Sequence, residues 1–184
     1  MKRFFGHLKT VIVHKYTVFV HSLKLGIPFR GFMHDFSKFS PTEFLPGVKY
    51  YNNGKKSPNE AERINNGYSR AWMHHKGKNK HHFEYWTAYS PIERRVMPVK
   101  MEYVYVLEMF CDRVAASKVY QGKNYTDRHP LEYFLRGKDK RFIHPVTSDE
   151  IEKMLTLLAD KGEKQAFEII RKNKKQFETE YINK

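Results

Sequence analysis

Cysteine and long apolar runs are both scarce in this sequence. Cys111 is the only cysteine among 184 residues, which excludes an intrachain disulfide scaffold and a cysteine-rich zinc site and is typical of the reducing cytoplasm. A membrane-spanning helix needs about 20 apolar residues, but Lys15, His21 and Lys24 interrupt the most apolar segment. We therefore expect a cytoplasmic protein with no membrane partner. The charged and imidazole groups near the N-terminus predict part of the fold rather than a secretory signal.

The common catalytic signatures are also missing. The sequence contains no G-x-x-x-x-G-K-[ST] loop, no G-x-G-x-x-G fingerprint, no G-x-S-x-G elbow and no H-E-x-x-H motif. These absences exclude P-loop, dinucleotide-binding, serine hydrolase and zincin functions. Cys111 lies in an apolar helical pattern, which favours a small core residue over a nucleophile.

Acidic residues are outnumbered, with 20 Asp and Glu against 34 Lys and Arg and a formal charge of +14. This surplus concentrates anions near the surface, so phosphate-bearing molecules, including nucleotides and nucleic acid, are candidate partners. The alternative is that the charge serves only solubility. An aromatic content of 15% excludes a disordered chain, which would lack the apolar surface needed to fold.

Helix starts can be identified from capping chemistry. Ser40, Ser57, Ser90 and Thr147 each begin a pattern with a Glu three residues later, which is typical of helix N-termini, and three of the four patterns place Pro at the first helical position. With the spacing of apolar residues, these starts predict an all-α, single-domain helical bundle. The predicted helices are about 3–25, 29–38, 41–51, 58–76, 91–121 with a break near Pro98, 148–160 and 163–181.

Within the single domain we expect two regions of different roles. A metal-site core extends over about residues 10–120, and covering helices extend over about 147–182. The segment around 123–146 is expected to be irregular, because turn-forming residues interrupt any apolar periodicity.

Histidines and carboxylates recur in an order that suggests metal binding. His7, His14 and His21 are spaced seven residues apart on one predicted helix face, and the adjacent pair His34-Asp35 follows. Further pairs occur at positions 74–75 and 81–82. Any one of these histidines alone is more often a packed, hydrogen-bonded residue. Together they predict a transition-metal site inside a helical bundle, in which the Asp35 carboxylate can bridge two ions.

The order of these groups resembles the HD superfamily of metal-dependent phosphohydrolases, helical proteins whose motif runs His, His-Asp, optional His residues and a late Asp. The resemblance covers about residues 10–120. It implies an HD-domain-like fold, one or two divalent transition-metal ions (Mn, Fe, Co or Zn) and hydrolysis of a phosphate ester. Carried onto this sequence, it implies the metal ligands His14, His34, Asp35, His75, His82 and Asp112.

Three further residues are candidate outer-sphere groups or substitute ligands, namely His74, His81 and Glu108. Glu108 lies one turn before Asp112, where it either accepts a hydrogen bond from a ligand imidazole or forms an ordinary ion pair. Within the predicted 58–76 helix, we expect His75 rather than His74 to point inward, because it continues the stripe of Ala61, Ile64, Tyr68 and Ala71.

Basic residues near the predicted ligands are candidate substrate contacts. Lys38 follows Asp35 by three residues, so its ammonium group can lie beside the ions and neutralise a phosphate oxygen. Asp35 and Lys38 are therefore the candidate catalytic residues, although Lys38 also fits a plain surface role. The candidate substrate-binding residues are Lys38, Arg70, Lys76 and Lys78.

The sequence is also similar to a family of small uncharacterised bacterial and phage proteins. The similarity rests on the strings MHDFSKFSPTEF at 33–44 and AWMHHKGKNKHHFEYW at 71–86. That resemblance implies no activity, so the functional hypotheses rest on the metal-site pattern.

Three classes of function fit the sequence. The first is a metal-dependent phosphohydrolase that uses metal-bound hydroxide on a nucleotide or nucleic-acid-derived substrate. The second is an HD-type diiron oxygenase, which the number of histidines allows. The third is a non-enzymatic basic helical module that binds nucleic acid or protein, with His34 and Asp35 merely tying helices together.

Overall fold

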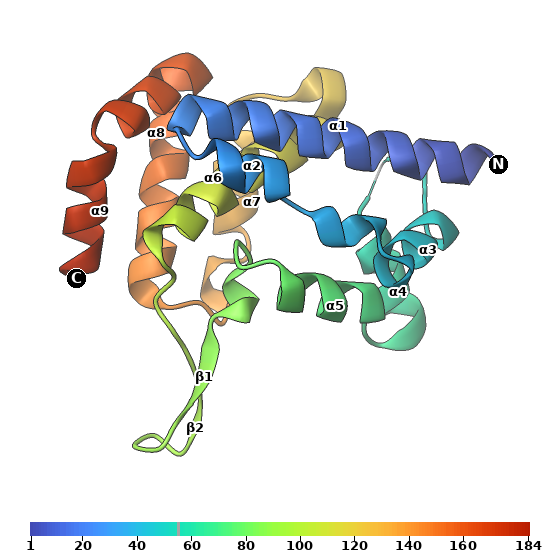
Figure 1. Cartoon of the computed structure of the whole chain (residues 1–184), viewed down its shortest axis with the longest axis horizontal. Helices are drawn as coiled ribbons and strands as arrows, with labels where there is room; N and C mark the ends of the chain where they lie inside the picture. The colour runs from blue at the N-terminus through green and yellow to red at the C-terminus, as the bar shows by residue number, and fades with distance from the viewer. Residues whose placement is uncertain (55) are drawn as a thin grey trace.

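Helices dominate the computed structural model, which describes residues 1–54 and 56–184 (Figure 1). This confirms the predicted mostly helical, single-domain fold. A two-stranded hairpin projects from the helices. In chain order the elements are α1 (Lys2–Leu25), α2 (Pro28–Met33), η1 (Phe36–Phe39), α3 (Pro41–Lys49), α4 (Pro58–Asn66), α5 (Arg70–Lys78), η2 (Phe83–Tyr85), β1 (Thr87–Ser90), β2 (Arg95–Pro98), α6 (Tyr103–Gln121), η3 (Gly122–Asn124), α7 (His129–Leu135), η4 (Lys138–Lys140), α8 (Pro145–Lys172) and α9 (Lys174–Ile182).

α6 is the central helix of the core. Every residue from Val106 to Cys111 is buried, so the helix is enclosed on all sides. α1 packs against it with Val11, Val18 and Leu25, and α8 covers another side. Figure 1 shows α1 running the length of the molecule, from α3 near its N-terminal end to α8 near its C-terminal end. Among the described residues, no helix has both the length and the hydropathy that crossing a bilayer requires.

The end of α1 directs the chain back along the same helix. Gly26 adopts the left-handed conformation (φ 66°), its N–H donates to the carbonyl of Leu23 (3.1 Å), and the N–H of Ile27 donates to that of Ser22 (2.9 Å). This is a Schellman motif, which closes the helix and reverses the chain. α2 therefore packs against α1, and the residues after α2 return toward the middle of α1.

The predicted helix over 29–38 ends earlier than expected. α2 stops at Met33, His34 is extended (ψ 129°), and Asp35 is left-handed (φ 55°) before the short 3₁₀ helix η1. Aspartate tolerates this backbone conformation better than most residues. The expected helix is therefore replaced by a sharp bend at the His34-Asp35 pair.

The predicted helix over 58–76 is two helices. Gly67 (φ 79°) ends α4, and the Ser69 hydroxyl caps α5 by accepting the N–H of Trp72 (2.9 Å). Because of this break, Ile64 and Tyr68 are exposed rather than part of the expected buried stripe.

The first part of the predicted helix over 91–121 is the β1–β2 hairpin, and α6 begins only at Tyr103. Ser90 accepts the N–H of Glu93 (3.1 Å), as a helix cap would, but here the bond closes a hairpin turn that Arg94 (φ 52°) completes. The strands are antiparallel with Tyr89 opposite Val96. A Ser-Pro-x-Glu pattern therefore stabilises a turn whether or not a helix follows.

The C-terminal helices begin and end differently from the prediction. α8 starts at Pro145, so Thr147 lies inside the helix, where its hydroxyl accepts the N–H of Met101 (3.2 Å) instead of capping. The expected break before residue 163 is a kink at Gly162 (φ 75°). The stretch around 123–146, expected to be irregular, contains α7.

Glu163, the residue after this kink, joins α8 to α1 and α6. Its carboxylate lies 2.6 Å from Lys24 Nζ and 3.4 Å from His21 Nε2, and it also pairs with Lys118. The hydrogen bond with His21 lowers the pKa of Glu163, burial opposes this, and the two ammonium groups lower the pKa further. The side chain is 18% exposed, so these contacts are only partly screened.

We expect Glu163→Gln to lower the free energy of unfolding by about 1.5–3 kcal/mol at neutral pH, the usual range for hydrogen bonds to a charged group. Since the folded pKa is below the unfolded value of about 4.3, the contribution is complete above that value and is lost as the pH falls through the lowered folded pKa. Urea unfolding of parent and variant at neutral and acidic pH measures this difference. The exposed Glu168→Gln on the same helix is the control, and an equal loss at both pH values would contradict the prediction.

Candidate metal centre

Seven histidine and aspartate side chains from five parts of the chain converge around α6. His14 comes from α1, the His34-Asp35 pair from the bend after α2, and Asp112 from α6. The others come from α5 and from the segment before η2, namely His75, His81 and His82. Their donor atoms fall into two overlapping sets, and within each set these atoms lie within 4.8 Å of one another.

The first set consists of His14, His34, Asp35 and Asp112. His14 Nε2 lies 3.0 Å from Asp112 Oδ1 and 3.7 Å from Asp35 Oδ2. His34 Nε2 lies 3.3 Å from Asp35 Oδ2 and 3.6 Å from Asp112 Oδ1. Two imidazoles and two carboxylates therefore face a common point.

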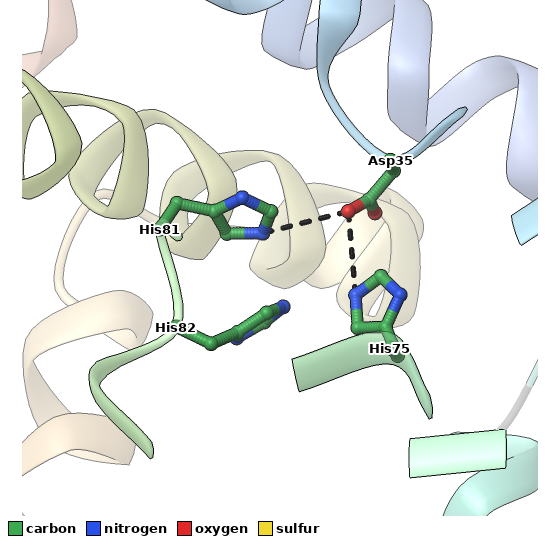
Figure 2. Close-up of side chains that lie close together, drawn as sticks. All are labelled: Asp35, His75, His81 and His82. Carbon is green, nitrogen blue, oxygen red and sulfur yellow. Dashed lines mark ion pairs between the residues drawn. The ribbon is translucent and has the colours of Figure 1, made fainter. Parts of the chain in front are cut away.

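The second set consists of Asp35, His75, His81 and His82 (Figure 2). Asp35 Oδ1 lies 3.3 Å from His75 Nε2 and 3.4 Å from His81 Nε2. In Figure 2 the ring of His82 points into the space between the other two imidazoles. The second set therefore holds three imidazoles and one carboxylate.

Asp35 belongs to both sets and divides its two oxygen atoms between them. Oδ2 faces His14 and His34, whereas Oδ1 faces His75 and His81. The left-handed backbone at Asp35 places the carboxylate between α1 and α5. This is the arrangement of a carboxylate that can bridge two neighbouring ions.

The donor atoms of the cluster do not satisfy one another by hydrogen bonding, whereas metal ions could bind them. Both Asp35 oxygens and the Nε2 atoms of His14, His34, His81 and His82 are buried without a well-directed hydrogen bond, although Lys38 lies close to Asp35 and His14 to Asp112. A buried polar atom that lacks a good hydrogen bond is costly, by roughly 1–3 kcal/mol. Imidazole and carboxylate are the ligands that transition metals prefer. The buried cluster can therefore hold a metal ion.

Glu43 orients a histidine of the second set through the ring nitrogen that faces away from the ligand atoms. Its Oε2 accepts a hydrogen bond from His75 Nδ1 (2.7 Å), and its Oε1 lies at the same distance from His74 Nδ1. A carboxylate at Nδ1 fixes the ring so that the Nε2 lone pair faces the ligand set. His75 is thus the inward residue of the pair, as expected, and His74 is the outer one. The sequence analysis missed Glu43 because its position in Ser40-Pro41-Thr42-Glu43 indicated only a helix cap.

Glu108 supports both sets at once. Its Oε1 accepts a hydrogen bond from His34 Nδ1 (3.0 Å) and lies 3.2 Å from His81 Nδ1. Arg30, which the sequence analysis did not single out, donates to its Oε2 at 2.8 Å. Burial opposes ionisation of Glu108, but the two imidazoles lower its pKa to about 2. Glu108 therefore orients one histidine of each set, the outer-sphere role considered for it from the sequence.

The aspartates of the cluster are held ionised. Burial raises the pKa of Asp35, but His34, Lys38 and His75 outweigh it and bring the pKa well below its usual range. Burial likewise opposes ionisation of Asp112, and hydrogen bonds from His14 and His34 bring its pKa well below its usual range. Both carboxylates can therefore act as anionic ligands.

Lys38 stands at the more open side of the cluster. Its Nζ lies 2.6 Å from Asp35 Oδ2, and its side chain is 29% exposed, against 1% for Asp35. Asp112 is 17% exposed, more than His14. The cluster is therefore partly open to solvent at Lys38 and Asp112.

The other predicted substrate contacts are on α5, beside the candidate ligand His75. Arg70 and Lys78 are exposed at the two ends of α5, and Lys76 is half-buried. In the described part of the chain, none of the three forms an ion pair with a cluster carboxylate. The break at Gly67 changes the direction of α5 relative to the single helix that the sequence predicted.

His7 and His21 do not join the cluster, although they share its spacing along α1. His7 lies against Gly47 and the ring of Phe44, and His21 lies beside Glu163. For these two residues the interpretation as packed residues rather than ligands is the correct one, with a carboxylate contact at His21.

Fold and cluster together define a mostly helical protein whose interior can hold metal. The chain belongs to the family of unknown function DUF5662, whose sequence profile matches residues 3–157. The match includes every residue of the cluster. The search of curated proteins and the search of solved structures each gave no match to the chain.

We expect Asp35→Ala to abolish metal uptake while the helical circular dichroism persists. The variant removes the one carboxylate that both sets share, whereas the apolar core around α6 does not depend on it. A left-handed alanine costs about 1–2 kcal/mol, so Asp35→Asn, which tolerates that backbone, separates backbone strain from the loss of charge. Metal content after dialysis is the measurement.

Asp139→Ala, in the exposed η4 segment, is the matched control and should bind metal as the parent does. Full metal content in Asp35→Ala, or loss of helical signal with metal retained, would show that Asp35 has a structural role instead.

Proposed function

We propose that this protein is a metal-dependent phosphohydrolase with two divalent ions that share Asp35. The observation that carries the proposal is the division of one buried carboxylate between two histidine-containing ligand sets. The order of the ligands along the chain, His, His-Asp, His, His and Asp, supports it through the resemblance to HD phosphohydrolases.

The ligand types favour Mn, Fe, Co or Zn over Mg or Ca, because the two sets together contain five imidazoles and two carboxylates. When bound, such ions lower the pKa of coordinated water, so that hydroxide is available near neutral pH, and neutralise charge on a phosphoryl group. The chain's own contribution is to hold and orient the ligands. Glu43 and Glu108 do this by accepting hydrogen bonds from Nδ1 atoms, which leaves Nε2 lone pairs facing inward.

Lys38 is the chain's candidate contact to substrate. Its ammonium group is at the open side of the cluster and carries a full charge, since burial is outweighed by Asp35 and Asp112, which raise the pKa of Lys38 above its usual value. A phosphate ester entering there meets a fixed positive charge beside the ligand sets. With a net charge of +14 on the chain, a nucleotide or the end of a nucleic acid is the proposed class of substrate.

The two-ion arrangement makes a stoichiometric prediction. His82→Ala removes a ligand of the second set only, and His14→Ala removes a ligand of the first set only. We expect each variant to retain about one ion where the parent retains two, because losing one ligand of a set typically weakens binding at that set alone. Elemental analysis counts the ions. Loss of both ions in both variants would contradict two separable sites.

We expect Lys38→Met to lower phosphate-ester hydrolysis roughly a hundred- to a thousand-fold, as removal of one charge-stabilising donor does in other enzymes. Metal content should stay equal or rise, because the lysine ammonium group competes for the Asp35 oxygen 2.6 Å away. Lys78→Met, an exposed lysine without cluster contacts, is the control.

The substrate screen covers mononucleotides, cyclic dinucleotides and short oligonucleotides with Mn, Co, Fe, Zn and Mg. If the fully metallated protein releases phosphate from none of them, the hydrolase proposal is wrong. Oxygen consumption by the iron form would then support a diiron oxygenase, and failure to take up any metal would support a binding module.

A further inference from the structure

α1 carries a second apolar face that is largely exposed in the described chain. Its core face holds Val11 and Val18, which are buried. The opposite side of the helix carries large apolar side chains that are exposed to solvent. These are Phe5 (63% exposed), Ile12 (51%), Tyr16 (67%) and Leu23 (49%). A helix that is apolar on two faces needs a partner for the second one.

The spacing of this second face is that of a helix-pairing seam. It runs through six positions separated alternately by four and three residues, namely Phe5, Lys9, Ile12, Tyr16, Phe19 and Leu23. This 4-3 alternation is the a/d pattern of coiled coils, in which each side chain packs between residues of a facing helix. Five of the six seam residues are apolar. The seam therefore fits an α-helix as its partner.

α2 and η1 extend the apolar surface beside the seam. Gly31 of α2 lies against the backbone of Phe19, and the rings of Phe32 and Phe36 are 5.7 Å apart. A fully exposed large side chain presents roughly 150–250 Å², so the exposed fractions along this surface amount to roughly 800 Å². That matches the area each partner contributes to a standard interface. The residues counted are Phe5, Ile12, Tyr16, Leu23, Phe29, Phe32, Met33 and Phe36.

Charge argues against an anionic membrane or a nucleic acid as the occupant. Three cations beside this surface make internal contacts, because Lys15 donates to the carbonyl of Phe32 (2.6 Å), Lys24 pairs with Glu163 and Arg30 pairs with Glu108. Lys9, within the seam, is exposed. Binding to lipid headgroups or phosphates needs free cations around the apolar surface.

We propose that this face pairs with the same face of a second copy of the chain, with the two α1 helices antiparallel. In a twofold arrangement centred between Ile12 and Tyr16, these two residues face each other across the seam. Phe5 then faces Leu23 of the second copy, and Lys9 faces Phe19. A parallel pair would instead place the two Lys9 side chains together. The seam is thus self-complementary in the antiparallel direction.

The dimer does not depend on the proposed hydrolase activity, but it bears on the same turn of α1. His14 lies between Ile12 and Tyr16 in the sequence and points the other way, toward Asp112. Pairing at the seam therefore braces the turn that supplies a ligand of the first set.

Light scattering on the eluting peak tests the proposal. The parent is expected to have twice the mass of one chain, and Ile12→Glu with Tyr16→Glu is expected to have half the parent's mass with unchanged circular dichroism. Because both side chains are exposed in one chain, the substitutions should not disturb folding. Ile92→Glu, at the 88% exposed tip of the hairpin, is the control and should remain dimeric.

Cysteine cross-linking tests the direction. Phe5→Cys and Leu23→Cys, made as separate variants, should form a disulfide-linked dimer when mixed and oxidised, and neither should do so alone. Native Cys111 is buried and does not interfere. A cross-link in Phe5→Cys alone would show a parallel seam and overturn the proposed geometry. A monomeric parent would overturn the dimer, and binding of that monomer to anionic vesicles or an oligonucleotide would assign the surface to the other partner.

Discussion

The buried carboxylate of Asp35 is the constraint on which the polar interior depends. Placing an ionised group where it is 1% exposed is costly unless opposite charge surrounds it. The cluster contains three further carboxylates, from Glu43, Glu108 and Asp112, and the cations that form ion pairs with cluster carboxylates are Arg30 and Lys38. With the imidazoles neutral, as metal binding requires, these paired groups leave an excess of two negative charges. Divalent ions between the histidine sets would neutralise that excess and give partners to the oxygens and nitrogens that lack a well-directed hydrogen bond.

A few local backbone conformations place the Asp35 carboxylate inside the cluster. The Schellman motif at Gly26 turns the chain back along α1, and α2 then carries it to the level of His14. The extended His34 and the left-handed Asp35 turn two adjacent side chains toward ligands on different helices. A continuous helix over 29–38 would separate these side chains by about 100° and could not aim both into one cluster in this way.

The sequence predicts features that depend on the order of residues along the chain. It does not predict features that depend on which distant segments come into contact. The order of His14, His34, Asp35 and Asp112 identified groups that the structure brings together. His81, named only as a substitute ligand, lies in the second set, because the loop after α5 directs both members of the 81–82 pair toward Asp35. Glu43 carries no sequence signal that separates a helix cap from a histidine partner. The hairpin was missed for the same reason, since Ser90 makes the same hydrogen bond in a turn as at a helix start.

α1 has two functional faces, a core face that positions His14 and an exposed apolar face that forms the proposed seam. The core face must hold His14 within a few tenths of an ångström of its place, because ligand sets tolerate little displacement. That face is anchored by Val18 and Leu25 toward the C-terminal end of α1, and by the contact of His7 with Gly47 of α3 near its N-terminal end. The turn with His14 lies between these anchors, and its opposite side carries the seam. An apolar partner along this seam would therefore restrain α1 from the side opposite His14, which gives a physical reason for an apolar face that the isolated chain leaves in water.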